Sequence, residues 1–448
     1  MANIMRSMTR GAILAGAALA LAGGAASAAP KAYVGNFADN TVSAIDTASG
    51  KVVATIPVAT GPHGMALSAD GKTLYVSGDG SSSLSVIDTA SDKVKSTVEV
   101  GKAPNGVTLT RDGKTLLVTV YAEDKIDFVD TKTLKITGSV AVPKPHTISI
   151  RPDGKLAYIT QQEPGNFALA VIDLGKRSVV KTIPLEKTPR DAEFGYSGKA
   201  FYFTEAGVAA VQVLDPKTDQ IVAQIPTGVS PHFVNLFKGT KLGIVVVQGP
   251  SELLLFDPKT NQEAQHIPVG KQPHWATLSS DGKTAYVTNE GANTLSVVDL
   301  ASGKSTTIDV GKAPRKVVVQ KAVAAQHADA GGAMMGMAMP GMVMPAAYHT
   351  RTTASATEEA QASDVIKISI ANFAFGPAAI TIHPGDTVTW SNNDGSAHTI
   401  TFKDGSGGSQ AIQPGESFTR KFDKAGNFDY FCSFHPYMTG KVTVAANS

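Results

Sequence analysis

A unit of about 42 residues repeats along the chain as far as residue 320, and this repeat limits the fold more than any other feature. The hairpin-turn tripeptide Asp-Gly-Lys, in exact or degenerate form, recurs at nearly constant spacing; its copies end in Lys72, Lys114, Lys155, Lys199, Lys241 and Lys283. Around each copy the order is a proline, a short apolar strand, the turn and a second strand, followed by two further strands. Four strands in a repeat of this length are typical of one β-propeller blade, and no helical spacing is sustained.

The number of blades follows from the prolines that open the first strand of each repeat: Pro62, Pro104, Pro145, Pro189, Pro231, Pro273 and Pro314. The chain enters with strands two to four of a blade, from KAYVG to VVATIPV, and leaves with an unpaired first strand, KVVVQ. Pairing of that last strand with the first blade closes the ring and removes free sheet edges. We therefore predict a seven-bladed propeller over residues 29–320.

The sequence of the blades resembles the YVTN family of propellers. Residues 286–289 are the family's namesake tetrapeptide Tyr-Val-Thr-Asn, and TVSAIDTASGKVVATIPV and TLSVVDLASGK follow its blade pattern. The resemblance covers about 290 residues and implies the fold. It implies little about function, because one fold serves many activities.

One position of the repeat, the residue after each leading proline, is mostly basic. In the seven blades it is His63, Asn105, His146, Arg190, His232, His274 and Arg315. Equivalent positions on the innermost strands gather around one mouth of the central channel, where imidazoles and guanidiniums suit a metal, an anion or a redox-active substrate. The competing interpretation is that these polar residues only cap a turn beside channel water.

Residues 1–28 have the pattern of an export signal. Arg6 and Arg10 precede the apolar run GAILAGAALALAGGAASA, which ends in an Ala26-Ser27-Ala28 cleavage motif. We expect cleavage after Ala28 and a periplasmic or secreted protein. The rest of the chain has no run of 18 apolar residues, so no membrane span is expected.

Charge and cysteine content exclude several function classes. A formal net charge of +2, with 17% charged residues, does not suit a nucleic-acid binder held by bulk charge. The single cysteine, Cys432, excludes an internal disulfide and any metal centre that needs two thiolates.

Residues 321–363 lack strand alternation and are rich in Ala, Gly, Ser and Thr, which predicts a flexible linker. Six methionines cluster there between His327 and His349: Met334, Met335, Met337, Met339, Met342 and Met344. Thioethers are soft ligands, so the cluster indicates additional copper(I) binding; the alternative is a plain spacer.

The last segment, residues 364–448, again has strand patterning and the size of a small β-sandwich. Four candidate metal ligands lie in two loops: His398 at the start of HTITF, and Cys432, His435 and Met438 in FCSFHPYMTG. A thiolate and two imidazoles with a weak axial thioether favour copper, since zinc more often recruits another thiolate or a carboxylate. The alternative interpretation is that Cys432 is only a buried core residue and not a metal ligand, but it leaves His435 and Met438 unexplained.

This segment resembles the cupredoxins of the amicyanin, pseudoazurin and plastocyanin group. The matching stretches are GDTVTWSNND, AHTITF, QPGESFTRKF and NFDYFCSFHPYMTGKVTV. The resemblance implies that His398, Cys432, His435 and Met438 are type 1 copper ligands and that the domain shuttles one electron. Thr399 departs from the family, where Asn often follows the first ligand, and His383 lies outside the pattern.

The sequence therefore predicts an all-β, two-domain exported protein that carries electrons. Its partner is expected to be a redox protein, such as a cytochrome or a periplasmic oxidoreductase, docking at His435, Pro436 and Tyr437 with the propeller as platform. One alternative is a copper-dependent oxidoreductase with its site at the channel mouth. A layout of this kind resembles nitrous oxide reductase, but the two-cysteine centre of that family is missing here. The second alternative is periplasmic copper homeostasis.

Overall fold

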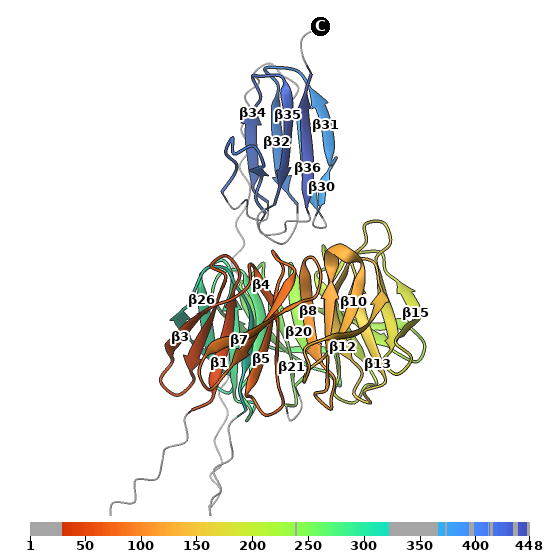
Figure 1. Cartoon of the computed structure of the whole chain (residues 1–448), viewed down its shortest axis with the longest axis vertical. Helices are drawn as coiled ribbons and strands as arrows, with labels where there is room; N and C mark the ends of the chain where they lie inside the picture. Colours follow the sequence, from red (N-terminus) through yellow and green to blue (C-terminus); the bar gives the residue numbers. More distant parts are fainter. Residues whose placement is uncertain are drawn as a thin grey trace, which may run out of the picture.

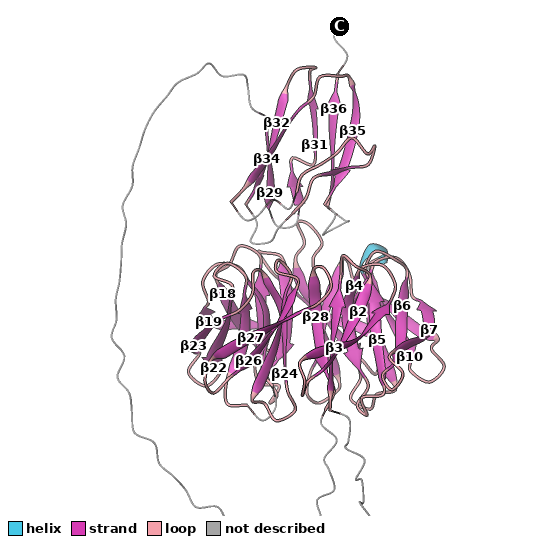
Figure 2. Cartoon of the chain, turned by 90° about the vertical axis from the view of Figure 1, so that its left-hand side faces the viewer, coloured by secondary structure: helices cyan, strands magenta, loops and turns pink. Residues whose placement is uncertain are grey.

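The structure is a computed structural model that describes residues 29–237, 240–321, 366–371, 374–393, 398–410, 412, 415–432 and 438–445. The predicted signal segment, the methionine cluster and His435 lie outside these ranges. Within them the chain is almost entirely β-strand, with one short 3-10 helix, η1 (Tyr121–Glu123), drawn in cyan in Figure 2. None of the described residues forms a helix long and apolar enough to cross a membrane.

Seven four-stranded antiparallel sheets form the blades of a propeller, as the repeat predicts (Figure 1). Six blades follow chain order from the innermost strand outward, and the remaining blade is β28-β1-β2-β3. The strands are β1 (Lys31–Asn36), β2 (Thr41–Asp46), β3 (Lys51–Pro57), β4 (Pro62–Leu67), β5 (Thr73–Gly78), β6 (Ser83–Asp88), β7 (Lys93–Glu99), β8 (Pro104–Leu109), β9 (Thr115–Val120), β10 (Lys125–Asp130), β11 (Ile136–Ala141), β12 (Pro145–Ile150), β13 (Leu156–Gln161), β14 (Ala168–Asp173), β15 (Ser178–Pro184), β16 (Pro189–Phe194), β17 (Phe201–Glu205), β18 (Ala210–Asp215), β19 (Gln220–Pro226), β20 (Pro231–Asn235), β21 (Gly243–Val247), β22 (Glu252–Asp257), β23 (Gln262–Pro268), β24 (Pro273–Leu278), β25 (Thr284–Asn289), β26 (Thr294–Asp299), β27 (Lys304–Asp309) and β28 (Pro314–Val319).

The Asp-Gly-Lys tripeptide makes the predicted turn between the first two strands of a blade. Gly71 adopts the left-handed conformation, with a φ of 71°, which is readily accessible to glycine. The carboxylate of Asp70 accepts hydrogen bonds from the hydroxyl of Ser68 at 2.6 Å and from the backbone N–H of Lys72 at 3.1 Å. The equivalent glycines of three other blades, Gly113, Gly154 and Gly282, have the same conformation, so the turn recurs with the repeat.

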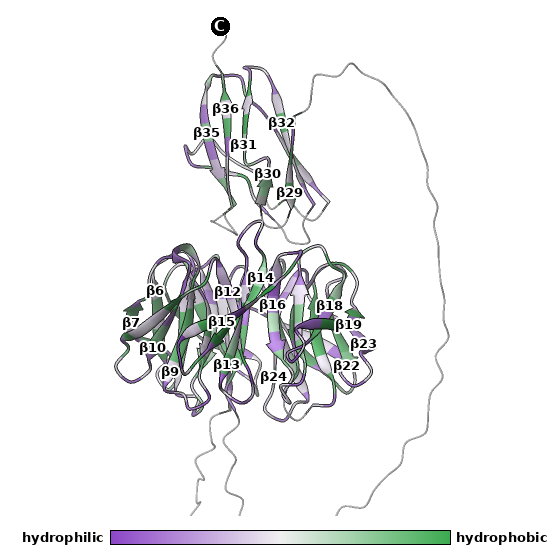
Figure 3. Ribbon diagram, turned by 90° about the vertical axis from the view of Figure 1, so that its right-hand side faces the viewer, coloured by the Kyte–Doolittle hydropathy of each residue, from purple (hydrophilic) through white to green (hydrophobic). Residues whose placement is uncertain are grey.

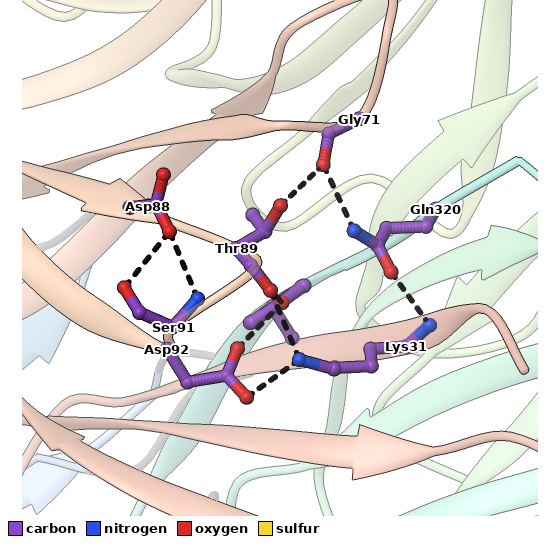
Figure 4. A network of polar contacts seen from close by, with 8 residues as sticks. Lys31, Gly71, Asp88, Thr89, Ser91, Asp92 and Gln320 are labelled. Atoms are coloured by element: carbon purple, nitrogen blue, oxygen red, sulfur yellow. Dashed lines mark hydrogen bonds and ion pairs between the residues drawn. The ribbon is translucent and has the colours of Figure 1, made fainter. Parts of the chain in front are cut away.

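Strand β28 closes the ring by pairing antiparallel to β1, with Tyr33 opposite Val318. The side chain of Gln320 accepts a hydrogen bond from the N–H of Lys31 at 2.9 Å and donates one to the carbonyl of Gly71 at 2.8 Å. Lys31 continues the network into the next blade through an ion pair of 2.6 Å with Asp92 (Figure 4). The two ends of the propeller sequence are thus joined to each other and to a neighbouring blade.

The cores of the propeller lie between adjacent blades, because successive residues of each strand point to opposite faces of the sheet. One such core combines Tyr33 and Val42 of the first blade with Met65 and Leu74 of the second. Hydrophobic residues are concentrated in the strands, and many connecting loops are hydrophilic (Figure 3). This packing fixes the positions of the seven innermost strands that line the channel.

The C-terminal strands form a two-sheet β-sandwich, with sheet orders β30-β29-β32-β34 and β31-β36-β35-β33. Its core surrounds Trp390 and Tyr430, both fully buried. Its strands are β29 (Ile366–Ala371), β30 (Ala374–Gly376), β31 (Ala379–Ile382), β32 (Thr387–Asn392), β33 (Thr401–Phe402), β34 (Ser417–Lys421), β35 (Gly426–Phe431) and β36 (Thr439–Val444).

The predicted strand HTITF is shorter in the structure than the sequence suggests. Only Thr401 and Phe402 pair with β35, whereas His398 forms an isolated bridge with Ile412. The first residues of HTITF are therefore part of a loop that positions a predicted ligand. The structure also adds β30, which the sequence pattern did not reveal.

Candidate metal centre and central channel

Cys432 follows directly after β35 and faces the interior of the sandwich. Alternation along the strand places Tyr430 and Cys432 on the same face, and both are completely buried. The backbone N–H of Cys432 donates a hydrogen bond of 3.0 Å to the carbonyl of Met438. This bond joins the two ends of the loop that carries three of the four predicted ligands.

His398 is held from the opposite side by its backbone. It exchanges two hydrogen bonds with Ile412, of 3.1 and 2.7 Å, and its side chain is fully buried. The buried side chain of Asn392, at the end of β32, donates a hydrogen bond of 2.8 Å to the carbonyl of Ile412. The position of this imidazole is therefore set by the protein chain.

The Sγ of Cys432 lies 3.6 Å from Nδ1 of His398. A metal–sulfur bond of about 2.3 Å and a metal–nitrogen bond of about 2.0 Å, at a trigonal angle of about 120°, place two ligand atoms about 3.7 Å apart. The pair therefore fits ligation of one copper ion. The same separation suits a sulfur–imidazole hydrogen bond in the chain without metal.

Thr399, where the sequence departs from the family pattern, adjoins the sulfur. Its backbone N–H donates to Sγ of Cys432 at 3.4 Å, and its hydroxyl lies 4.0 Å from the same atom. The hydroxyl also lies 3.2 Å from that of Thr401. The backbone N–H favours negative charge on the sulfur, which is the form that binds metal.

Met438 also fits the predicted site, since its side chain is 2% exposed and packs in the same core cluster as Cys432. His435, Pro436 and Tyr437 lie outside the described residues. Within the part of the chain that is described, no group of three His, Cys, Asp or Glu side chains is suited to hold a metal. His383 has a side chain that is 77% exposed, as expected of a surface residue.

At the propeller, the residues after the leading prolines do gather at the channel. The ring centroid of His63 lies 5.6 Å from that of His146 and 5.9 Å from that of His274. The ring centroids of His232 and His274 are 4.1 Å apart. His146 donates from Nδ1 to the carbonyl of Arg190 at 3.0 Å, and His232 donates to the carbonyl of His274 at 3.1 Å. Two of these imidazoles therefore contribute to contacts between blades.

Burial keeps these imidazoles neutral. It lowers the pKa of His63, His232 and His274 well below the usual value, and that of His146 to about 4. The nearby guanidinium of Arg315 acts in the same direction. A neutral imidazole is the form that ligates metal.

The two arginines of this ring make contacts within the protein. Arg190 donates to the hydroxyl of Ser230 at 2.9 Å, and Arg315 donates to the carboxylate of Glu290 at 3.1 Å. The guanidinium of Arg315 also lies 3.5 Å from the centroid of the Phe37 ring.

Sequence reasoning missed three charged residues of the channel: Asp191, Glu193 and Lys316. They follow the mouth residues on β16 and β28, at positions where the other blades carry uncharged residues. That departure from the repeat was the available signal.

Each of the two domains matches a known family model over part of its length. Residues 343–444 match a model described as a cupredoxin-like domain, and residues 6–113 match one described as a YNCE-like beta-propeller. The chloroplastic plastocyanin of Tetradesmus obliquus is 43% identical over 83 residues, which are 16% of this chain and 57% of the plastocyanin. Amicyanin-alpha of Methylorubrum extorquens is 33% identical over 94 residues, which are 20% of this chain and 78% of the amicyanin.

The propeller has a similar fold to a solved structure, the Kuenenia stuttgartiensis hydrazine synthase. The match has a TM-score of 0.54 at 22% identity and covers 62% of this chain and 92% of the other. At this level of identity the similarity shows the fold alone. The predicted combination of a propeller with a cupredoxin domain is confirmed.

Proposed function

We propose that this chain, which belongs to the cupredoxin family through its C-terminal domain, is an exported one-electron carrier with a single type 1 copper centre. Its ligands are His398, Cys432, His435 and Met438. Copper bound there supplies a one-electron couple between its +1 and +2 states. The observation that carries the proposal is the buried pair of His398 Nδ1 and Cys432 Sγ, 3.6 Å apart.

The residues around this pair restrict how far the ligands can move. The bridge between His398 and Ile412 holds one ligand, and the hydrogen bond from Cys432 to Met438 joins two others. Asn392 fastens the bridge to β32. A site held by the protein in one geometry changes little when its charge changes, which favours fast electron exchange.

The apolar core around the pair excludes water. Tyr430 is fully buried and its ring centroid lies 5.4 Å from that of Trp390, while Phe402 packs 5.7 Å from Tyr430. A dry surrounding of this kind tunes the potential of a bound metal and limits solvent rearrangement. The backbone N–H of Thr399 adds a fixed dipole directed at the sulfur.

The division of the chain into segments, and the role of each segment, are part of the same proposal. The chain divides into a signal segment (1–28), a propeller (29–320), a methionine-rich linker (321–363) and the cupredoxin domain (364–448). The propeller is the docking platform, and a redox protein of the periplasm approaches His435, Pro436 and Tyr437. The linker methionines bind additional copper(I).

Copper(II) titration of the full-length protein, followed by visible absorption, tests the copper assignment. One equivalent is expected to develop an intense blue band, because charge transfer from a cysteine thiolate to copper(II) produces it. Cys432→Ser is expected to remove the band. The control His383→Gln, which changes an exposed histidine, is expected to retain it. A wild-type protein that binds copper without this band contradicts the type 1 assignment.

A further inference from the structure

The propeller channel encloses a cavity of about 360 Å³, which is within the size range of small-molecule sites. Its walls come from the innermost strands of the blades. Six polar residues of the lining decide its chemistry: His63, Asn105, Asp191, Glu193, His274 and Lys316. None of them belongs to the proposed copper centre.

Two carboxyl groups lie on one wall, both from β16. Asp191 is 3% exposed and accepts a hydrogen bond of 3.2 Å from the N–H of Val234. Glu193 accepts one of 3.1 Å from the hydroxyl of Ser149. Among the described residues neither carboxyl group forms an ion pair.

Lys316 supplies the opposite charge from β28. Its ammonium group lies 4.0 Å from the centroid of the Trp275 ring, and no described carboxylate forms an ion pair with it. The charges of Asp191 and Glu193 nevertheless act on it across the channel. The cavity therefore holds two acids and one ammonium group, and each acid attracts the ammonium group without forming an ion pair with it.

These groups titrate close to neutral pH. Burial raises the pKa of Asp191 to about 7 and that of Glu193 to about 8, and it lowers the pKa of Lys316 to about 8. Placing ionisable groups in such an environment is unfavourable unless charged partners are available. Perturbed groups in a cavity are typical of binding sites.

Two neutral polar atoms of the lining also lack a partner among the residues that the structure describes. Oδ1 of Asn105 and Nδ1 of His274 are buried, and no described residue forms a hydrogen bond with either atom. Their residues are 2% and 6% exposed. Buried polar atoms without partners are rare, and these two lie in the wall of the same cavity as the charges.

We propose that this cavity binds a small molecule carrying both an ammonium group and a carboxylate, that is, an amino acid or a zwitterion of similar size. The ammonium group pairs with Asp191 and Glu193, and the carboxylate pairs with Lys316. A ligand with only one of these charges leaves the opposite group of the cavity without a partner, so both charges contribute to recognition.

Isothermal titration calorimetry of the full-length protein tests this proposal with three zwitterions, L-alanine, 4-aminobutyrate and L-lysine. At least one is expected to bind with a stoichiometry of one. Two further probes resolve the contribution of each charge: cadaverine is L-lysine without the carboxylate, and hexanoate has no amine. Each is expected to bind at least tenfold more weakly than the best zwitterion. If none of the zwitterions binds at millimolar concentration, the proposal is wrong.

Two variants test the acidic and the basic group of the cavity separately. The pattern of their effects on the affinities of the probes distinguishes a loss of binding contacts from misfolding. Asp191→Asn keeps an acceptor for Val234 and is expected to weaken both the best zwitterion and cadaverine at least tenfold. Lys316→Met is expected to abolish the preference for the zwitterion over cadaverine while cadaverine itself still binds. Glu263→Gln, on the exposed outer strand β23, leaves all affinities unchanged. Equal effects of both variants on every probe, or no effect of either, overturn the assignment.

Discussion

The sulfur of Cys432 lies 3.6 Å from Nδ1 of His398, although 34 positions separate the two residues in the chain. The contact depends on the bridge between His398 and Ile412, which the side chain of Asn392 fastens to β32. Asn392 is thus the residue through which the sandwich core positions one ligand of the proposed copper centre.

Replacing Asn392 by Leu leaves the carbonyl of Ile412 without its buried donor. We expect a loss of about 1–3 kcal/mol in the stability of the C-terminal domain, together with a shifted blue band, because the histidine is less well held. Chemical denaturation and visible absorption measure the two effects. The control is Thr419→Ala on the exposed face of β34, for which both should stay close to wild type. A band unchanged in Asn392→Leu argues against the positioning role.

The ring closure predicts a second effect on stability. Asp92 accepts a hydrogen bond of 2.8 Å from the buried hydroxyl of Tyr33. It also forms the ion pair with Lys31 (Figure 4). Asp92→Ala removes the carboxylate that Tyr33 and Lys31 share, and we expect a loss of about 1–3 kcal/mol in the stability of the propeller.

The matched control for this prediction is the more exposed pair of Lys181 and Asp219. Lys181→Met is expected to change stability by no more than about 1 kcal/mol, since exposed ion pairs contribute little. Differential scanning calorimetry of the full-length protein compares the two variants. Equal losses would show that the closure network is no more important than a surface ion pair.

The channel carboxyls predict how propeller stability depends on pH. Burial, and next the negative charge of Asp191, raise the pKa of Glu193 from 4.5 to about 8. Between these values the native protein holds a proton that the unfolded chain releases, so this group lowers stability as pH rises from 4.5 to 8.

Glu193→Gln removes this contribution and retains an acceptor for Ser149. The melting temperature of the variant relative to wild type should therefore increase from pH 5 to pH 8. Thermal unfolding at several pH values, followed by circular dichroism, measures this difference. A difference that stays constant with pH contradicts the assigned titration.

The methionine cluster of the linker predicts an effect on copper(I) alone. Thioethers bind copper(I) well and copper(II) poorly. Replacing Met334, Met335, Met337, Met339, Met342 and Met344 by Leu should lower the copper(I) stoichiometry under reducing conditions without altering the blue band. An unchanged stoichiometry leaves the segment a spacer.

The sequence predicted what depends on local repetition. The seven prolines and the turns around residues such as Gly71 fix seven blades, and alternation along β35 places Cys432 inward. It did not predict the hydrogen bond from Asn392 to the carbonyl of Ile412, because no local pattern shows which carbonyl a distant amide will reach. The opposition of Lys316 to Asp191 and Glu193 also arises only when the ring closes. The sequence pattern also did not show that His398 bridges to Ile412 while only Thr401 and Phe402 pair with β35, since both pairings depend on distant segments.

Redox titration shows whether the chain is a one-electron carrier with Cys432 in its copper centre. The copper-loaded full-length protein is poised at a series of potentials while the blue band is recorded. We expect one reversible transition with the slope of a one-electron couple, and no such transition for Cys432→Ser. A wild-type protein whose band does not follow the applied potential reversibly, or a Cys432→Ser variant that retains the same transition, would contradict it.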